Sequence, residues 1–218
     1  METIQSSKPD IIIVDDNLNF RQGLIFLITI DNVANVIGKA SNEKEFMKML
    51  SHQEPDVVLI DISMLLKNEM EIAIRTFEMR PELKIIAFTM FGDEEYYFKL
   101  SNLGVKGFLL KSGGINELEK AIENVMKGET YVSDQLFKKI IINFIRSNPG
   151  NIIERAELEP AEKQIIDLTY QGMTNDAIAQ SLFITSNEVK NYKSSLLRKI
   201  STQYSLQDIF KESGLMLG

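Results

Sequence analysis

The residues from Val57 to Ile60 form an unbroken apolar run that ends in a carboxylate, Asp61. A run of this length fits a strand that is buried on both faces, as in a parallel sheet. In open α/β sheets, ligands bind at the carboxyl ends of the strands, which is where Asp61 stands. Taken alone, however, Asp61 is more simply a residue that starts the next turn or caps the next helix. The residues that end the other predicted strands, however, favour a ligand-binding site.

Three more apolar runs also end in polar side chains. The first run leads into the acid pair Asp15 and Asp16, and two later runs end in Thr89 and Lys111. If the strands are neighbours, three carboxylates share one rim, where unit charges about 5 Å apart repel by roughly 3 kcal/mol at an effective dielectric near 20. A hard cation offsets that repulsion, and Mg²⁺ takes one or two carboxylates together with waters and phosphate oxygens. The pattern therefore predicts a magnesium site.

An acid pair, a lone Asp, a Thr and a Lys that end successive strands resemble the receiver domain of two-component response regulators. The resemblance covers residues 1–130. Helical periodicity between the apolar runs, for example over 18–30, already predicts alternating strands and helices. The resemblance implies an α/β fold: a five-stranded, doubly wound parallel sheet of the flavodoxin-like kind, with strand order 2-1-3-4-5 and the acid rim at the switch point.

The resemblance also implies roles for individual residues. Asp61 is the nucleophile that accepts a phosphoryl group, and Lys111 and Thr89 contact that group in a protein that modifies itself and is not a turnover enzyme. Thr89 and Phe108 form a switch pair, although an ordinary core phenylalanine fits Phe108 nearly as well. The expected Mg²⁺ ligands are Asp15, Asp16, Asp61 and the backbone carbonyl of Ser63.

Two positions after Asp61 depart from the family pattern. Leu65 stands where proline is usual, and Glu69 stands where glycine is usual. Proline fixes φ and glycine permits positive φ, so we expect this loop to take another path and to affect the rate of phosphorylation.

The alternation of strands and helices stops after Gly128. Residues 131–156 are expected to form one more helix, over 134–146, and a linker over 147–156 that contains Pro149 and Gly150. Residues 157–218 read as four short helices, and they resemble the LuxR-type helix-turn-helix of the NarL/FixJ class. The stretches that carry this resemblance are Leu158–Glu162, Gly172–Asn175, Ile178–Ala179, Leu182–Ile184, Val189–Tyr192 and Leu197–Ile200.

The third of these helices is locally basic inside a chain with a net charge of -7. We therefore expect modest non-specific affinity for DNA and a need for dimerisation. Glu188 could repel phosphate or accept from a cytosine amino group. The core of this domain is expected to contain Ile178, Leu182, Val189 and Leu196. The candidate DNA contacts are Asn187, Glu188, Lys190, Asn191, Lys193 and Ser194.

Two functions of different classes remain open. The first is a transcription regulator with a histidine kinase, a DNA operator and a phosphorylation-dependent homodimer as partners. The second is a phosphorylation-dependent module whose helical domain binds a protein instead of DNA. A Mg²⁺-dependent phosphatase would need a carboxylate two residues after Asp61, where Ser63 stands. The chain has no cysteine, no signal-peptide pattern and no apolar run near the roughly 20 residues of a membrane span, so a cytoplasmic location is expected.

Overall fold

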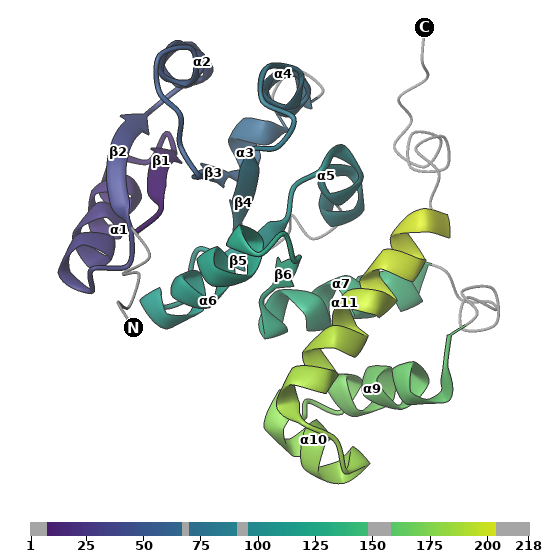
Figure 1. Cartoon of the computed structure of the whole chain (residues 1–218). Helices are drawn as coiled ribbons and strands as arrows, with labels where there is room; N and C mark the ends of the chain where they lie inside the picture. Colours follow the sequence, from purple (N-terminus) through teal and green to yellow (C-terminus); the bar gives the residue numbers. More distant parts are fainter. Residues whose placement is uncertain (1–7, 67–69, 91–95, 148–157, 204–218) are drawn as a thin grey trace, which may run out of the picture. The chain divides into compact units, whose positions relative to one another are not determined.

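The computed structural model of this 218-residue chain describes residues 8–66, 70–90, 96–147 and 158–203. The chain divides into two compact units. We call residues 1–90 with 103–131 the sheet unit, and residues 91–102 with 132–218 the helical unit. Each unit is described by itself (Figure 1).

The sheet unit contains a parallel sheet whose first five strands have the expected order, β2-β1-β3-β4-β5. The expected count of five strands was wrong, because a sixth strand follows β5 at the edge. This strand is only two residues long, and its Tyr131 amide donates to the carbonyl of Lys106 at 2.9 Å. The strands are β1 (Asp10–Val14), β2 (Asn35–Ala40), β3 (Val57–Asp61), β4 (Lys84–Thr89), β5 (Gly107–Leu110) and β6 (Tyr131–Val132).

Helices cover both faces of this sheet (Figure 1). On one face, α1 (Leu18–Ile30) and α6 (Ile115–Met126) pack against apolar side chains of β1, β3, β4 and β5. On the other face lie α2 (Glu43–Leu50), α3 (Ile62–Leu65) and α4 (Glu71–Met79). Every residue of β3 is buried, as its unbroken apolar run predicted.

The short helix α3 was not expected. It begins directly after Asp61, and its Met64 and Leu65 side chains are fully buried. The path after Asp61 is thus helical, with Leu65 contributing to the core where the family pattern has proline. Glu69 lies outside the described residues, but the next residue, Met70, has a φ of 67°. Met70 therefore has a left-handed backbone conformation, although the glycine of the family pattern is absent at position 69.

The helical unit contains most of α5 (Tyr97–Leu103), α7 (Asp134–Ser147) and three further helices, α9 (Pro160–Tyr170), α10 (Asn175–Leu182) and α11 (Ser186–Gln203). Ser147 belongs to α7, whereas the rest of the expected linker lies outside the described residues, as does the last of the four helices expected over residues 157–218. No helix in the described ranges is long and apolar enough to span a membrane.

The three helices α9, α10 and α11 share a small apolar core. Ile165, Ile178, Ala179 and Val189 form its centre, and Leu182 packs against it. Leu196 is also fully buried, so the expected core of this region is confirmed. The turn between α10 and α11 places Phe183 in a left-handed conformation with a φ of 57°. This tight turn joins two helices as in a helix-turn-helix.

Candidate functional site

The acid rim predicted from the sequence is present at the carboxyl ends of β1 and β3. These strands are parallel neighbours, with Val14 beside Ile60, so the residues that follow them meet. Carboxylate oxygens of Asp15, Asp16 and Asp61 all lie within 4.8 Å of one another. Asp15 and Asp61 are buried, whereas Asp16 is exposed.

Local hydrogen bonds fix Asp15 in this rim. Its Oδ1 accepts from the Asn17 amide at 2.7 Å, and its backbone carbonyl accepts from the buried Arg21 guanidinium. The side chain of Asn17 in turn caps α1 by accepting from the amides of Asn19 and Phe20. The start of α1 therefore holds the end of β1 in place.

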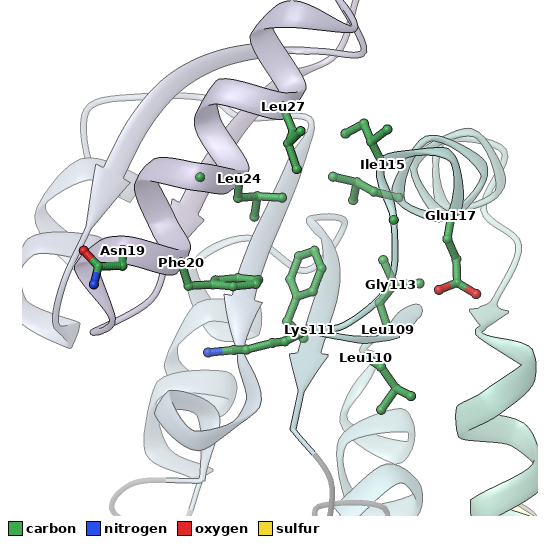
Figure 2. A pocket seen from close by; sticks show the side chains of 14 residues that line it. Asn19, Phe20, Leu24, Leu27, Leu109, Leu110, Lys111, Gly113, Ile115 and Glu117 are labelled. Atoms are coloured by element: carbon green, nitrogen blue, oxygen red, sulfur yellow. The ribbon is translucent and has the colours of Figure 1, made fainter.

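Lys111 neutralises two of the three carboxylates. Its Nζ lies 2.6 Å from Asp15 Oδ2 and 2.9 Å from Asp61 Oδ2, with little of the side chain exposed. Burial alone would lower the pKa of Lys111, but hydrogen bonds and charge attraction from both carboxylates outweigh it and raise this pKa. The lysine therefore carries its charge throughout the neutral range. Its side chain also lies against the Phe20 ring, whose centroid is 4.7 Å from Nζ (Figure 2).

Asp61 has two roles at once in this geometry. It caps α3, because its Oδ1 accepts from the Ser63 amide at 3.2 Å. The Ser63 hydroxyl also donates to Asp61 Oδ2 at 2.7 Å. The simpler interpretation, a helix cap, is thus confirmed, and it is compatible with the site interpretation, which stays a prediction. Together with the ion pair to Lys111, these contacts hold the side chain of Asp61 at the rim.

The expected switch residues lie on the two strands beyond β3. Thr89 ends β4, is buried, and donates its hydroxyl to the Met90 carbonyl at 2.8 Å. Its own carbonyl accepts from the Lys111 amide at 2.8 Å, which ties the end of β4 to the end of β5. Phe108 is fully buried on β5 and pairs with Ala87. The strand ends thus bring Thr89 and Lys111 to the same edge as the carboxylates.

The residues at the rim fit a divalent cation. All three are oxygen donors, the type that Mg²⁺ prefers. Asp15 Oδ2 is buried and has no well-aligned hydrogen bond within the described ranges, its contact being the ion pair with Lys111. The exposed Asp16 lies beside it. The backbone carbonyl of Ser63 stays a prediction.

The helical unit presents five of the six candidate DNA contacts at its surface. The side chains of Asn187, Glu188, Lys190, Asn191 and Ser194 are exposed on α11. Lys193 is the exception, with only 6% of its surface exposed.

Glu188 stabilises the start of α11. Its Oε2 accepts from the Thr185 amide at 2.7 Å and from the Thr185 hydroxyl at 2.8 Å, while the Glu188 amide donates to that hydroxyl at 3.1 Å. This is a capping box, which the spacing Thr185-x-x-Glu188 could have revealed. The backbone and side-chain bonds from Thr185 lower the pKa of Glu188. Helix capping therefore explains the acid at position 188 without any ligand.

Lys193 is held by α7 inside the helical unit. Its Nζ lies 3.2 Å from Asp134 Oδ1 and 4.7 Å from the centroid of the Phe137 ring. Asp134 also accepts two bonds from the Asn175 amide group, at 2.8 and 2.9 Å. Burial lowers the pKa of Lys193, and Asp134 offsets part of that effect. Sequence reasoning missed this contact, and in this arrangement Lys193 faces α7.

A second lysine of α11 is neutralised within the unit. Lys199 Nζ lies 2.8 Å from Oε2 of the buried Glu162 on α9, which also accepts from the Ser195 hydroxyl and the Glu159 amide. Burial raises the pKa of Glu162, but these hydrogen bonds outweigh it and lower the pKa overall. The local positive charge predicted for this helix comes from Lys190, Lys193, Arg198 and Lys199, and of these four side chains Lys190 and Arg198 are exposed.

Two family models match this chain. The response regulator receiver domain matches residues 11–123, and the bacterial regulatory proteins of the luxR family match residues 156–209. Among curated proteins, the oxygen regulatory protein NreC of Staphylococcus aureus (strain bovine RF122 / ET3-1) is 32% identical over 200 residues. That match covers 87% of this chain and 90% of the relative.

Solved structures share the fold. A structure of two RcsB dimers bound to two parallel DNAs matches with a TM-score of 0.57 at 20% identity, and covers 97% of this chain and all of that one. A LuxR-family two-component response regulator from Aurantimonas sp. SI85-9A1 matches with a TM-score of 0.58 at 24% identity, over 64% of this chain and 99% of that one. The acid rim, the helix-turn-helix and these matches agree: the chain belongs to the two-component response regulators of the NarL/FixJ class, in which a receiver domain is followed by a LuxR-type DNA-binding domain that regulates transcription.

Proposed function

We propose that Asp61 accepts a phosphoryl group from a histidine kinase and that this modification controls DNA binding by α11. The observation that carries the proposal is the contact of Lys111 Nζ with both Asp15 and Asp61, at 2.6 and 2.9 Å. The carboxylate of Asp61 lies at a strand end beside the ammonium group of Lys111, which could move from the carboxylate oxygens to the oxygens of a phosphoryl group. The family membership of the chain supports the same role.

The chemistry at this site is a displacement at phosphorus. An Asp61 oxygen forms the new P–O bond while the bond between phosphorus and the donor histidine nitrogen breaks, and the nitrogen keeps the electron pair. Phosphoryl transfer of this kind depends on positioning and charge stabilisation more than on acid–base groups. Mg²⁺, held by Asp15, Asp16 and Asp61, would neutralise the phosphoryl oxygens. Lys111 would supply a second positive charge, and the Thr89 hydroxyl would donate to the same group.

The output side requires α11 to leave its contact with α7. Lys193 is buried against Asp134 and Phe137, so a state that uses it on DNA must expose it. One helix-turn-helix reads too short a site for genomic selectivity, and a dimer that reads two half-sites about one helical turn apart solves this. A phosphoryl group would have to favour the active state by about 5.5 kcal/mol to move the population from 1:99 to 99:1.

Phosphoryl labelling tests the nucleophile. With acetyl phosphate and Mg²⁺, the intact mass of the wild-type chain should rise by one phosphoryl group, and Asp61→Asn should show no rise. Asp31→Asn, an exposed position at the end of α1, serves as the control that removes the same charge. Equal labelling of the Asp61→Asn chain would refute the assignment.

A protein partner for the helical domain is the second candidate. The burial of Lys193 and the pairing of Lys199 with Glu162 favour it, because they reduce the positive charge that α11 exposes. The capping box explains Glu188 without a protein ligand, which removes one reason for this candidate. If the phosphorylated chain has no affinity for the DNA upstream of its own gene or other candidate operators, and binds a protein through α11, the second candidate replaces the first.

A further inference from the structure

A buried cation, Arg21, lies beside the acid rim. Its side chain belongs to α1, and only 9% of the residue is exposed. The guanidinium donates to the backbone carbonyl of Asp15, and it makes no ion pair with any residue that the structure describes. Arginine is rarely buried in folded proteins unless its charge is paired. The burial of Arg21 therefore needs compensation from charges that lie farther away than a direct ion pair.

The position of Arg21 within α1 makes its charge still less favourable. Its amide donates to the Asn17 carbonyl at 3.0 Å and so closes the first turn of the helix. Near the N-terminus of a helix, the macrodipole favours acids and disfavours cations. The removal of a charged group from water is unfavourable as well. The helix itself thus gives no reason for a positive charge here, and the compensating charge must come from outside α1.

The acid rim supplies this negative charge. Because the guanidinium bonds to the main chain of Asp15, it lies within one residue of two of the three carboxylates, those of Asp15 and Asp16. Lys111 pairs with Asp15 and Asp61 at the same rim. With every group ionised, three carboxylates face two cations, so the rim carries one net negative charge before a metal ion enters.

The main chain of Asp15 is fixed from two sides, which also fixes the place of the guanidinium. Its amide donates to the Ala40 carbonyl at 3.1 Å, and its carbonyl accepts from Arg21. Directly after Ala40, the amide and hydroxyl of Ser41 donate to Glu45 of α2. These hydrogen bonds from Ser41 lower the pKa of Glu45 most, and the charge of Arg21 lowers it further. The positive charge of Arg21 therefore acts on acidic groups beyond its own helix.

We propose that Arg21 sets the net charge of the acid rim, so that Mg²⁺ binds weakly and the metal-loaded rim stays positive for an incoming phosphoryl group. With a divalent ion bound, the rim would carry one net positive charge, whereas without Arg21 it would only be neutral. A phosphoryl group brings nearly two negative charges, which favours the positive rim. Arg21 touches neither the metal nor the phosphoryl group in this role. The inference rests on the proposed function, in which the rim holds Mg²⁺.

Mg²⁺ binding to the intact chain, with no phosphoryl donor present, tests this role. Arg21→Met removes the charge and keeps a long side chain, so Mg²⁺ should bind about tenfold tighter or more. Arg21→Lys keeps the charge and should bind Mg²⁺ nearly as the wild type does. Calorimetric titration with magnesium chloride measures the affinity. The rise of Tm with Mg²⁺ concentration checks it, because that increment is measured from the metal-free Tm of each variant.

Arg80→Met is the matched control. Arg80 precedes β4 and pairs with the exposed Glu54 at 3.3 Å, so this variant loses the same charge at the opposite edge of the sheet. If Arg80→Met tightens Mg²⁺ binding as much as Arg21→Met does, the net charge of the chain explains the effect and the proposal is overturned. Unchanged or weaker binding by Arg21→Met also overturns it, because Arg21 then only anchors the Asp15 carbonyl. Equally tight binding by Arg21→Lys would refute the role of charge.

Labelling of Asp61 by acetyl phosphate gives a second measurement on the same chains. In Arg21→Met, the Mg²⁺ concentration for half-maximal labelling should fall, and the maximal rate should fall as well, because the loaded rim has lost a positive charge. A variant that only disturbs the fold would need more Mg²⁺, so a rise in that concentration contradicts the proposal. Mg²⁺ binding in the expected order without any labelling would refute the phosphoryl role of Asp61 and support that of Arg21. A wild-type chain that binds no Mg²⁺ would refute the metal site and this inference together.

Discussion

Removal of the Asp134 carboxylate should release α11 from α7. Asp134→Ala deletes the ion pair with Lys193 at 3.2 Å and both hydrogen bonds from Asn175. Asp134 is 58% exposed at its side chain, so water and salt screen the pair, and such a pair contributes about 0.2–1 kcal/mol. The buried Asn175 donors would lose their partner, which costs roughly 1 kcal/mol more. The arrangement in which α11 packs against α7 should therefore lose about 1–2 kcal/mol of free energy relative to one in which α11 is released. This corresponds to a factor of roughly 5–30 in the equilibrium between the two arrangements.

DNA binding by the unphosphorylated chain measures this shift. Fluorescence anisotropy at fixed salt, with the DNA upstream of its own gene, should show an affinity five- to thirtyfold higher for Asp134→Ala, roughly the factor worked out above. Hydrogen exchange of the α11 amides should rise in the absence of DNA. Asp134→Asn, which keeps an acceptor for Asn175, should give a smaller gain.

Asp167→Ala is the matched control, because Asp167 is an exposed acid on α9 and its removal changes the net charge equally. If Asp167→Ala raises the affinity as much as Asp134→Ala does, the gain comes from net charge and the contact with α7 is irrelevant. If neither variant changes affinity or exchange, Lys193 does not restrain α11.

Three further predictions concern the acid rim and the helical unit. Asp16→Ala should abolish Mg²⁺-dependent labelling of Asp61 without changing the thermal unfolding of the chain; wild-type labelling that persists in excess chelator would refute the metal role. Glu162→Gln should lower the free energy of unfolding of the helical unit by about 1–3 kcal/mol in urea titrations, because Lys199 loses its buried charged partner. Since the pKa of Glu162 is lowered from 4.5, its stabilisation is present above that value and fades as the pH falls through the lowered pKa; the variant should lack this acid dependence. Lys190→Ala should weaken operator binding and reduce the salt slope by about one, whereas Lys163→Ala on α9 should not; equal slopes for all three chains would favour the protein-binding candidate.

The acid rim was predictable because the carboxyl ends of neighbouring parallel strands meet at one edge, whatever the details of packing. Alternating apolar runs and helical periodicity were likewise enough for the alternation of strands and helices, whereas the order of β1 to β5 in the sheet came from the resemblance to the receiver family. The two-residue strand β6 is too short to give a pattern, and α3 follows a buried strand with four residues of which three are apolar, so nothing marks a boundary between them. Only the cap by Asp61, visible in three dimensions, separates the two elements.

The helical unit shows a different limit of sequence reasoning. The capping box of Thr185 and Glu188 lies within four residues and was readable, but Glu188 was interpreted only against a ligand. The burial of Lys193 was not readable, because its partner Asp134 lies 59 residues earlier in the chain. Local signals therefore predict helix ends, whereas the exposure of a basic side chain depends on which distant element packs over it.

The sheet divides the surroundings of the proposed phosphoryl site at Asp61 into two halves. Successive strand residues point to opposite faces, so Phe88 and Leu109 join the layer of α1 and α6, while Ala87 and Phe108 face the other layer. Thr89 ends β4 and Lys111 directly follows β5, so both residues lie at the edge of the sheet where the two layers meet. One chemical event at the edge of the sheet can thus be transmitted in two directions at once, toward the α1 surface through Phe20 and toward the opposite layer through Phe108. A substitution in one layer could then silence one output and leave the other intact.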